Sequence, residues 1–189
     1  MAEEAINYRI VRSRRKTIAI QITPEGTVLV RCPKRMAAGD VRRFVESKAD
    51  WIKRHLARAE QRQAMPKFSP EEIKALAETA RKVIPERVAF FGEKMGVSYG
   101  AVTIRSQHTR WGSCSGKGNL NFNCLLVLTP TEVMDYVIVH ELCHRREMNH
   151  SARFWAEVEK VLPDYRERKQ WLKENGGTLI GRLPGKEKP

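Results

Sequence analysis

The chain has 189 residues, of which 35 are Lys or Arg and 22 are Asp or Glu, and its formal net charge is +13. Apolar residues make up 41% and charged residues 30%, a balance typical of folded proteins that excludes a disordered chain. No apolar segment approaches the roughly 20 residues needed to span a bilayer, and the acidic N-terminus lacks the pattern of a secretory signal. The four cysteines form no Cys-x-x-Cys pair, which excludes a four-cysteine zinc ribbon and argues against a disulfide framework. We therefore expect a cytoplasmic protein without a membrane partner.

The positive charge is concentrated in the first third of the chain. Residues 1–66 hold 15 Lys and Arg against 7 Asp and Glu, whereas residues 67–189 hold 20 against 15. Such a field attracts nucleic acid or nucleotides, although charge of this kind can also serve solubility alone. The polar segment 61–68 contains Pro66 and reads as a boundary. We therefore expect a basic strand-and-helix module at 1–66 and a second domain at 67–189.

The N-terminal module begins with alternating apolar residues, which predict three short strands at 6–10, 18–22 and 28–30. The sequence Pro24-Glu25-Gly26 predicts a turn between the last two, and Pro33 ends a small antiparallel sheet. A helical pattern follows over residues 41–56. Ser47 could cap a second helix within it, so one bent helix or two are both compatible with the pattern.

In the second domain, Ser69, Pro70 and Glu72 form a capping box that predicts a helix toward Gly92, with Pro85 as a potential kink. Strands are expected at 102–105 and at 120–124. The second of these has one apolar face and one face rich in Asn side chains. Together the elements predict an α+β fold, in which strands and helices of the first module precede a compact domain.

The segment Thr129-Pro130-Thr131-Glu132 predicts a capping box and a helix whose Val137-Ile138-Val139 run indicates burial. Within this helix lies the motif His140-Glu141-x-x-His144. Residues four apart in a helix are offset by about 40° and stacked about 6 Å apart, so both imidazoles can reach one metal ion. The carboxylate of Glu141 is then placed to take a proton from a water activated by zinc.

A catalytic zinc site needs a third protein ligand, and two residues compete for this role. Glu147 lies on the same helical face as His140, but about 10 Å along the axis if the helix continues. His150 can reach the site only if the helix stops after His144 and the chain turns back. Asn149 and the potential N-cap Ser151 make that break plausible, so the spacing favours His150.

Several segments together resemble one known family, the YgjP-like zinc metallopeptidases. They are His140-Glu141-Leu142-Cys143-His144, Asn149-His150-Ser151, Phe154-Trp155, Arg110-Trp111-Gly112-Ser113-Cys114, Val30-Arg31-Cys32-Pro33 and Asp50-Trp51-Ile52. The spacing is also similar to that of the WLM and SprT-like DNA-linked proteases and, more loosely, of the metzincins, which have Gly where this chain has Glu147. The resemblance covers nearly the whole chain.

The resemblance implies a compact zincin-like catalytic domain. It implies one Zn²⁺ per chain, held by His140, His144 and His150, with Glu141 as the general base. The strand at 120–124 would lie near the cleft, where such strands pair with an extended peptide. The remaining candidate contacts to the substrate or its oxyanion are Arg110, Trp111, Asn121, Asn123, Tyr136 and Tyr165.

The sequence leaves three functions to compare. A zinc-dependent peptidase acting on a protein or peptide substrate is the first. The second is a metal-dependent hydrolase of nucleotide phosphoanhydrides, which the positive charge favours but the lack of a Gly-rich phosphate loop disfavours. The third is a non-catalytic nucleic-acid-binding module with a structural metal.

Overall fold

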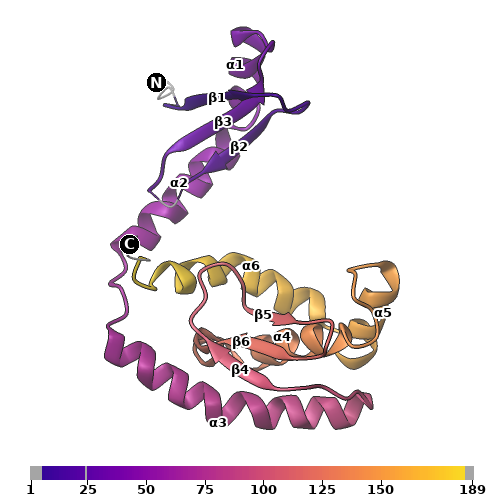
Figure 1. Cartoon of the computed structure of the whole chain (residues 1–189). Coiled ribbons are helices and arrows are strands. Elements are labelled where there is room, and N and C mark those ends of the chain that lie inside the picture. Colours follow the sequence, from indigo (N-terminus) through magenta and orange to yellow (C-terminus); the bar gives the residue numbers. More distant parts are fainter. Residues whose placement is uncertain (1–5, 24, 186–189) are drawn as a thin grey trace. The chain divides into compact units, whose positions relative to one another are not determined.

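The structure is a computed structural model that describes residues 6–23 and 25–185 (Figure 1). The chain divides into two compact units, unit 1 at Met1–Pro66 and unit 2 at Lys67–Pro189. Each unit combines helices with a small three-stranded sheet, so the fold class is α+β. Among the described residues, no helix has the length and apolar character that crossing a membrane requires.

The sheet of unit 1 is mixed and not antiparallel as predicted. Its strands are β1 (Arg9–Ser13), β2 (Ala19–Ile22) and β3 (Val28–Pro33), in the order β1-β3-β2. A tight turn, in which Gly26 has a φ of 78°, joins β2 and β3 as an antiparallel pair. The strand β1 pairs with the other edge of β3, and these two strands run parallel. Pro24 of the predicted turn lies outside the described residues.

Two helices, α1 (Ala38–Glu46) and α2 (Ala49–Ala64), complete unit 1. The break between them lies at Ser47, but this residue does not cap the second helix. Its hydroxyl donates to the carbonyl of Phe44 at 2.8 Å, and Lys48 precedes α2 without a side-chain cap. The core of unit 1 is a small apolar cluster of Val28, Val30, Cys32, Val41, Val45 and Ile52.

Unit 2 begins with α3 (Pro70–Met95), and the predicted capping box is confirmed. The Ser69 hydroxyl accepts from the backbone N–H of Glu72, whose carboxylate accepts from the N–H of Ser69. The helix continues through Pro85 and ends at Gly96, which has a left-handed backbone with φ 62°. Gly at this position ends a helix without the steric strain that a Cβ would add.

A second sheet, of order β4-β6-β5, is formed by β4 (Val102–Arg105), β5 (Gly112–Cys114) and β6 (Leu120–Asn123). It leads through the 3₁₀ helix η1 (Cys124–Leu128) into α4 (Thr131–Cys143), which is buried on nearly all sides. The capping box predicted for α4 is absent. Pro130 precedes the helix, and the Thr129 hydroxyl donates to the carbonyl of Leu126 instead of capping the helix.

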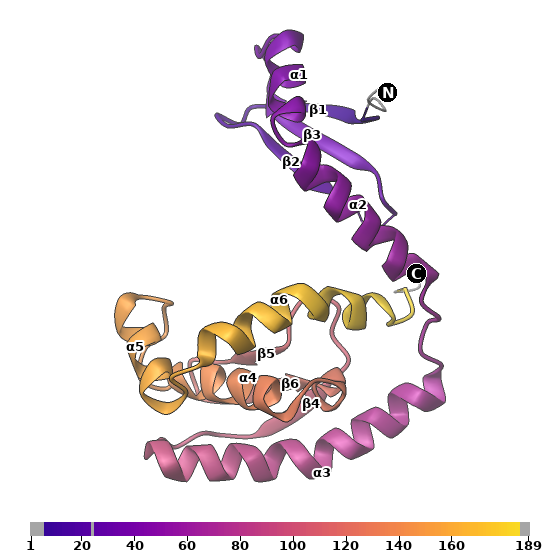
Figure 2. The same ribbon diagram turned by 180° about the vertical axis from the view of Figure 1, so that it is seen from behind.

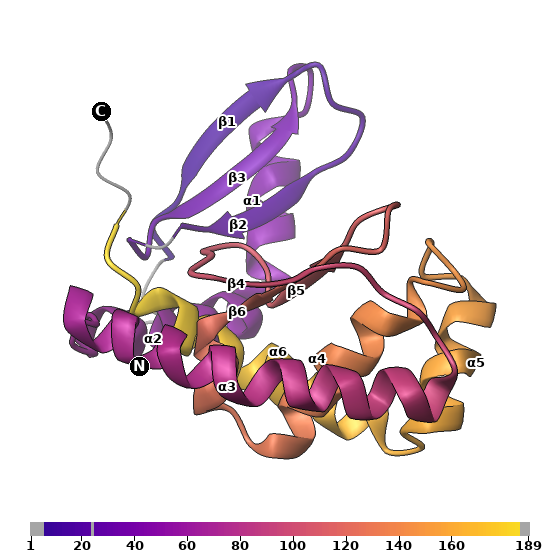
Figure 3. The same ribbon diagram turned by 60° about the horizontal axis from the view of Figure 1, so that its bottom comes forward.

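The last helices are α5 (Ala152–Val161) and α6 (Tyr165–Gly181). No helix is predicted from the sequence for the α6 segment, which contains two adjacent glycines, each costing about 1 kcal/mol in a helix. Figures 2 and 3 show α4 between α3 and α6. A two-point ion pair joins Arg87 of α3 to Asp135 of α4, with nitrogen–oxygen distances of 2.8 and 2.6 Å, and fixes α4 against α3.

Candidate metal centre

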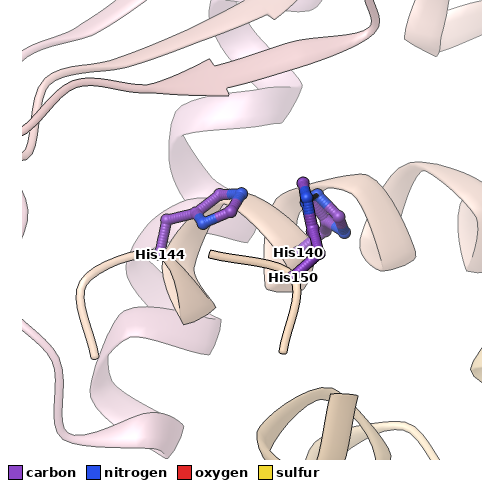
Figure 4. Close-up of side chains that lie close together, drawn as sticks. All are labelled: His140, His144 and His150. Carbon is purple, nitrogen blue, oxygen red and sulfur yellow. Dashed lines mark hydrogen bonds between the residues drawn. The ribbon is translucent and has the colours of Figure 1, made fainter. Parts of the chain in front are cut away.

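Three histidines converge at the C-terminal end of α4 (Figure 4). His140 belongs to the last turns of α4, His144 is the residue that follows the helix, and His150 precedes α5. One ligand nitrogen from each lies within 4.8 Å of the others, and the Nε2 atoms of His140 and His150 are 2.9 Å apart. Within residues 6–23 and 25–185, no second group of His, Cys, Asp or Glu is arranged to hold a metal ion.

The chain reverses after α4, and this reversal brings His150 back to the helix. The predicted break is confirmed, since α4 ends at Cys143, and Ser151 caps α5 by accepting from the N–H of Phe154. Asn149 does not supply the left-handed backbone that the sequence suggested. Among the described residues only glycines have positive φ, so the reversal is made of ordinary turns.

Two arginines that directly follow His144 anchor this reversal. The Nε of Arg145 donates to the carbonyl of Ser98 at 2.9 Å, and Arg146 donates to the carbonyl of Met95 and to the carboxylate of Glu157 in α5. The reversal is thereby tied to the end of α3 and to α5. A local pattern could not single out these arginines, because their partners lie about 50 and 11 residues away.

Two of the three histidines, His140 and His144, are held in the neutral form that a metal ligand requires. Burial is the main reason why the pKa of His140 is lowered to about 3. Positive charge on His144, His150 and Lys169 lowers this pKa further. Burial also lowers the pKa of His144. The Nδ1 of His144 faces the carbonyl of Glu147 at 3.1 Å, an arrangement that leaves Nε2 for a metal.

The donor set fits zinc. Two neutral imidazole nitrogens that face each other at 2.9 Å repel, unless a proton or a cation lies between them. Tetrahedral zinc at about 2.1 Å from each nitrogen requires a spacing of about 3.4 Å, so a small shift of His140 or His150 is enough to make room for it. Glu147, the rival ligand, is not part of the cluster and contributes its backbone carbonyl to His144.

Glu141 lies beside this cluster, on the side of α4 that packs against β5. Its side chain is buried, and the residue is only 6% exposed. A Cβ on Gly112 would come within 2.7 Å of Glu141 Cγ and Oε1, so only glycine allows the strand to approach this closely. The pKa of Glu141 is raised to about 8 because burial outweighs the opposing effects of the Arg110 charge and of the Cys114 backbone N–H.

Two cavities share Gly112, His140 and Glu141 as a common wall. The metal cavity, of about 280 Å³, is further lined by Ser113, Cys114, His144, Met148 and His150. The second cavity, of about 190 Å³, is further lined by Trp111, Tyr136, Val137 and Leu172. His140 and Glu141 therefore border both cavities.

The structure brings some of the other predicted contacts to these cavities. Trp111 and Tyr136 line the second cavity, and burial raises the pKa of Tyr136 to about 12. Arg110 acts on Glu141 through its charge but lines neither cavity. Tyr165 packs against Trp155 at a ring distance of 5.4 Å and also lines neither. Met148 lines the metal cavity and Leu172 the second cavity, although no sequence pattern marks either residue.

The Asn side chains of β6 bind other parts of unit 2. Asn123 is buried and donates to the carbonyls of Gln107 and Arg110, so it holds the loop before β5. Asn121 donates to the Ser113 hydroxyl at 3.4 Å. Because β6 pairs with β4 on one edge and β5 on the other, the expectation that this strand pairs with a peptide is wrong.

The YgjP-like metallopeptidase domain matches residues 16–76 and 70–175. The crystal structure of the metallopeptidase zymogen abylysin of Pyrococcus abyssi is 25% identical, with 49% of this chain and 94% of that chain covered and a TM-score of 0.44. That of the zymogen jannalysin of Methanocaldococcus jannaschii is 21% identical, with 50% and 97% covered and a TM-score of 0.45. No curated protein matches the chain.

Proposed function

The chain belongs to the YgjP-like metallopeptidase family, and from this premise we propose that it is a zinc-dependent peptidase. One zinc ion per chain is held by His140, His144 and His150, and Glu141 is the general base. The observation that carries the proposal is the convergence of three imidazole nitrogens within 4.8 Å of one another beside a buried carboxyl group.

Three protein ligands leave a tetrahedral metal one open position, as catalytic zinc sites require. When bound, zinc lowers the pKa of water toward about 7 and polarises the carbonyl of the scissile peptide. Burial raises the pKa of Glu141 to about 8. A nearby dication favours the ionised form of this carboxyl group and so lowers its pKa. The carboxylate is then ready to accept a proton at neutral pH.

Glu141 is proposed to accept a proton from the attacking water and to pass it to the leaving amine. Its position supports this role, because the backbone N–H of Cys114 stabilises the carboxylate and Gly112 packs against its side chain. Glu141 is held against β5 and borders both cavities, so a single carboxyl group reaches substrate on either side.

The substrate backbone is proposed to pair with β5 and not with β6. β5 has one paired edge, toward β6, where Trp111 accepts from the N–H of Asn123 and Ser115 donates to the carbonyl of Asn119. Backbone groups alternate in direction along an antiparallel strand, so those of Gly112 and Cys114 point to the other edge. The Cys114 N–H there bonds to the Glu141 carboxylate, so a peptide would pair with the Gly112 groups and the Cys114 carbonyl. Both residues line the metal cavity, and an extended peptide added there would cross it.

The nucleotide hydrolase is disfavoured by the composition of the cavities. Phosphoanhydrides are bound by Lys and Arg side chains or by Gly-rich loops. Of the described residues that line the two cavities, none is Lys or Arg. A peptide, which needs backbone hydrogen bonds and apolar contacts, fits these walls better.

The proposal is tested by comparing the zinc-loaded wild-type protein with Glu141→Gln. Loss of a general base costs about 10²–10⁴-fold in rate, so peptide hydrolysis should fall by that factor while zinc content, measured by plasma mass spectrometry, stays at one per chain. Removal of zinc by a chelator should abolish hydrolysis, and zinc should restore it. A Glu141→Gln protein that cleaves peptides at the wild-type rate would exclude the assigned base.

A further inference from the structure

The second cavity differs in character from the metal cavity beside it. Apart from the shared wall of Gly112, His140 and Glu141, the described residues that line it are Trp111, Tyr136, Val137 and Leu172. Their side chains are aromatic or aliphatic, and none carries a charge. A pocket of this composition gains most from an apolar group that leaves water.

The size of the cavity suits one side chain. Its volume is about 190 Å³, and an apolar protein cavity of about 150 Å³ accommodates a benzene molecule. The cavity could therefore hold a phenyl or isobutyl group. Because His140 and Glu141 belong to both cavities, a group in the second one would be carried by a residue next to the scissile bond.

The walls of this cavity are held by packing. Tyr136 and Val137 lie one turn before His140 in buried α4, and Leu172 comes from α6. The indole of Trp111 packs on Gly176 of α6, where a Cβ would lie 3.0 Å from Nε1 and 3.1 Å from Cζ2. Gly176 is buried in the middle of a helix, where glycine is unfavourable by about 1 kcal/mol, and this contact is a reason for it.

We propose that the cavity between Trp111 and Leu172 is a specificity pocket for an aromatic or branched aliphatic side chain flanking the scissile bond. The inference rests on the proposed peptidase function and adds the class of substrate to it. Trp111 and Leu172 are the specificity-determining side chains, and Gly176 positions the indole.

The experiment measures binding and needs no turnover. Zinc-loaded protein is titrated calorimetrically with four small hydroxamates, whose common head group chelates zinc and whose substituent is methyl, benzyl, carboxyethyl or aminobutyl. An apolar group that fits such a pocket gains roughly 10–200-fold in affinity. The benzyl compound should therefore bind at least about tenfold more tightly than the other three. Benzyl binding equal to methyl binding would overturn the proposal.

Variants of α6 test whether a preference for the benzyl compound comes from this pocket. Leu172→Trp should fill the cavity and bring the benzyl-to-methyl affinity ratio near one, and Leu172→Ala should favour a naphthyl substituent over benzyl. Gly176→Ala should reduce the ratio by displacing the indole, whereas Gly177→Ala, the same change at the exposed neighbouring glycine, should leave it unchanged. A ratio that no change at Leu172 or Gly176 alters would overturn the assignment.

The methyl compound distinguishes a failure of the pocket proposal from a failure of the zinc site. If it binds zinc-loaded protein but the benzyl compound binds no better, the pocket assignment is wrong and the metal site stands. If neither hydroxamate binds, the open zinc site itself is refuted, and the pocket proposal falls with it.

Discussion

The two units of this protein differ in where their charged and polar side chains lie. Unit 1 is the more basic for its length, and its charged side chains surround a small apolar core. Unit 2 places polar groups inside: among the described residues, the buried polar side chains are Asn123, Asp135, Glu141 and His144. All pKa shifts in which burial is the largest cause also belong to unit 2.

This difference indicates where the chemistry lies. Burial of an ionisable group is unfavourable unless a partner compensates it, so such groups persist mainly where they have a role. Asp135 is compensated by Arg87, and Asn123 by backbone groups. The Nδ1 of His140 is buried without a hydrogen-bond partner. For Glu141, the Cys114 N–H and the Arg110 charge do not offset burial, which raises its pKa to about 8.

The largest effect is expected from removal of a histidine ligand. His150→Ala should reduce zinc affinity by more than about 100-fold, because three ligands become two and the exposed position can be refilled only by water. His55→Ala in unit 1, a half-buried histidine stacked on Trp51, is the matched control and should keep one zinc per chain. Plasma mass spectrometry after dialysis measures both. Zinc retained by the His150→Ala variant would show that another residue is the third ligand.

The stability of the metal-free protein should depend on pH through His140 and Glu141. His140 has its pKa lowered from 6.5 to about 3, so the unfolded chain binds that proton more tightly and stability falls as pH drops below 6.5. Glu141 has its pKa raised from 4.5 to about 8, so the folded state binds that proton more tightly and stability falls as pH rises from 4.5 through 8.

The two contributions oppose each other between pH 4.5 and 6.5, and stability should be highest there and decline on both sides. One pKa unit corresponds to about 1.4 kcal/mol, so each decline should amount to a few kcal/mol in urea unfolding. Glu141→Gln should remove the decline between pH 6.5 and 8. If that variant keeps the same alkaline decline, Glu141 is not its cause.

A smaller effect is expected at the contact between β5 and α4. In Gly112→Ala the new Cβ would lie 2.7 Å from Glu141 Oε1, and the carboxyl group must move. Displacement of a catalytic group by about 1 Å lowers the reaction rate by up to roughly 100-fold. We therefore expect kcat/KM for peptide cleavage to fall by about 10–100-fold and the zinc content to stay unchanged. Gly116→Ala, with no atom within 4 Å of its Cβ, should retain full activity. Equal activity of the two variants would contradict the positioning role of Gly112.

The smallest effect is expected from removal of unit 1. All three histidines, Glu141 and both cavities belong to unit 2. A chain of residues 67–189 should therefore bind one zinc and cleave short peptides as the whole protein does. Loss of zinc from this shorter chain, with its circular dichroism spectrum intact, would show that unit 1 contributes to the site.

The sequence alone supports much of this description because the relevant signals are local. The spacing of His140, Glu141 and His144 places them on one helical face, and Ser69 with Glu72 marks the start of α3. The break that allows His150 to return was also predicted, from the capping residue Ser151. Each of these depends on residues within about ten positions of one another, where helix geometry fixes the relation.

The features that only the tertiary structure decided all join distant segments. Alternation along β1 and β6 predicted strands, but it could not state that β1 pairs in parallel with β3 or that β6 has both edges occupied. Within α6, Gly176 packs against Trp111, 65 residues earlier, and the paired glycines themselves give no sign of that contact. In the same way, β5 lies against Glu141 through contacts between α4 and a strand that precedes it by about 30 residues. Strand pairing and side-chain packing between remote residues are decided by the burial of apolar surface in the whole unit, and a local pattern does not contain that information.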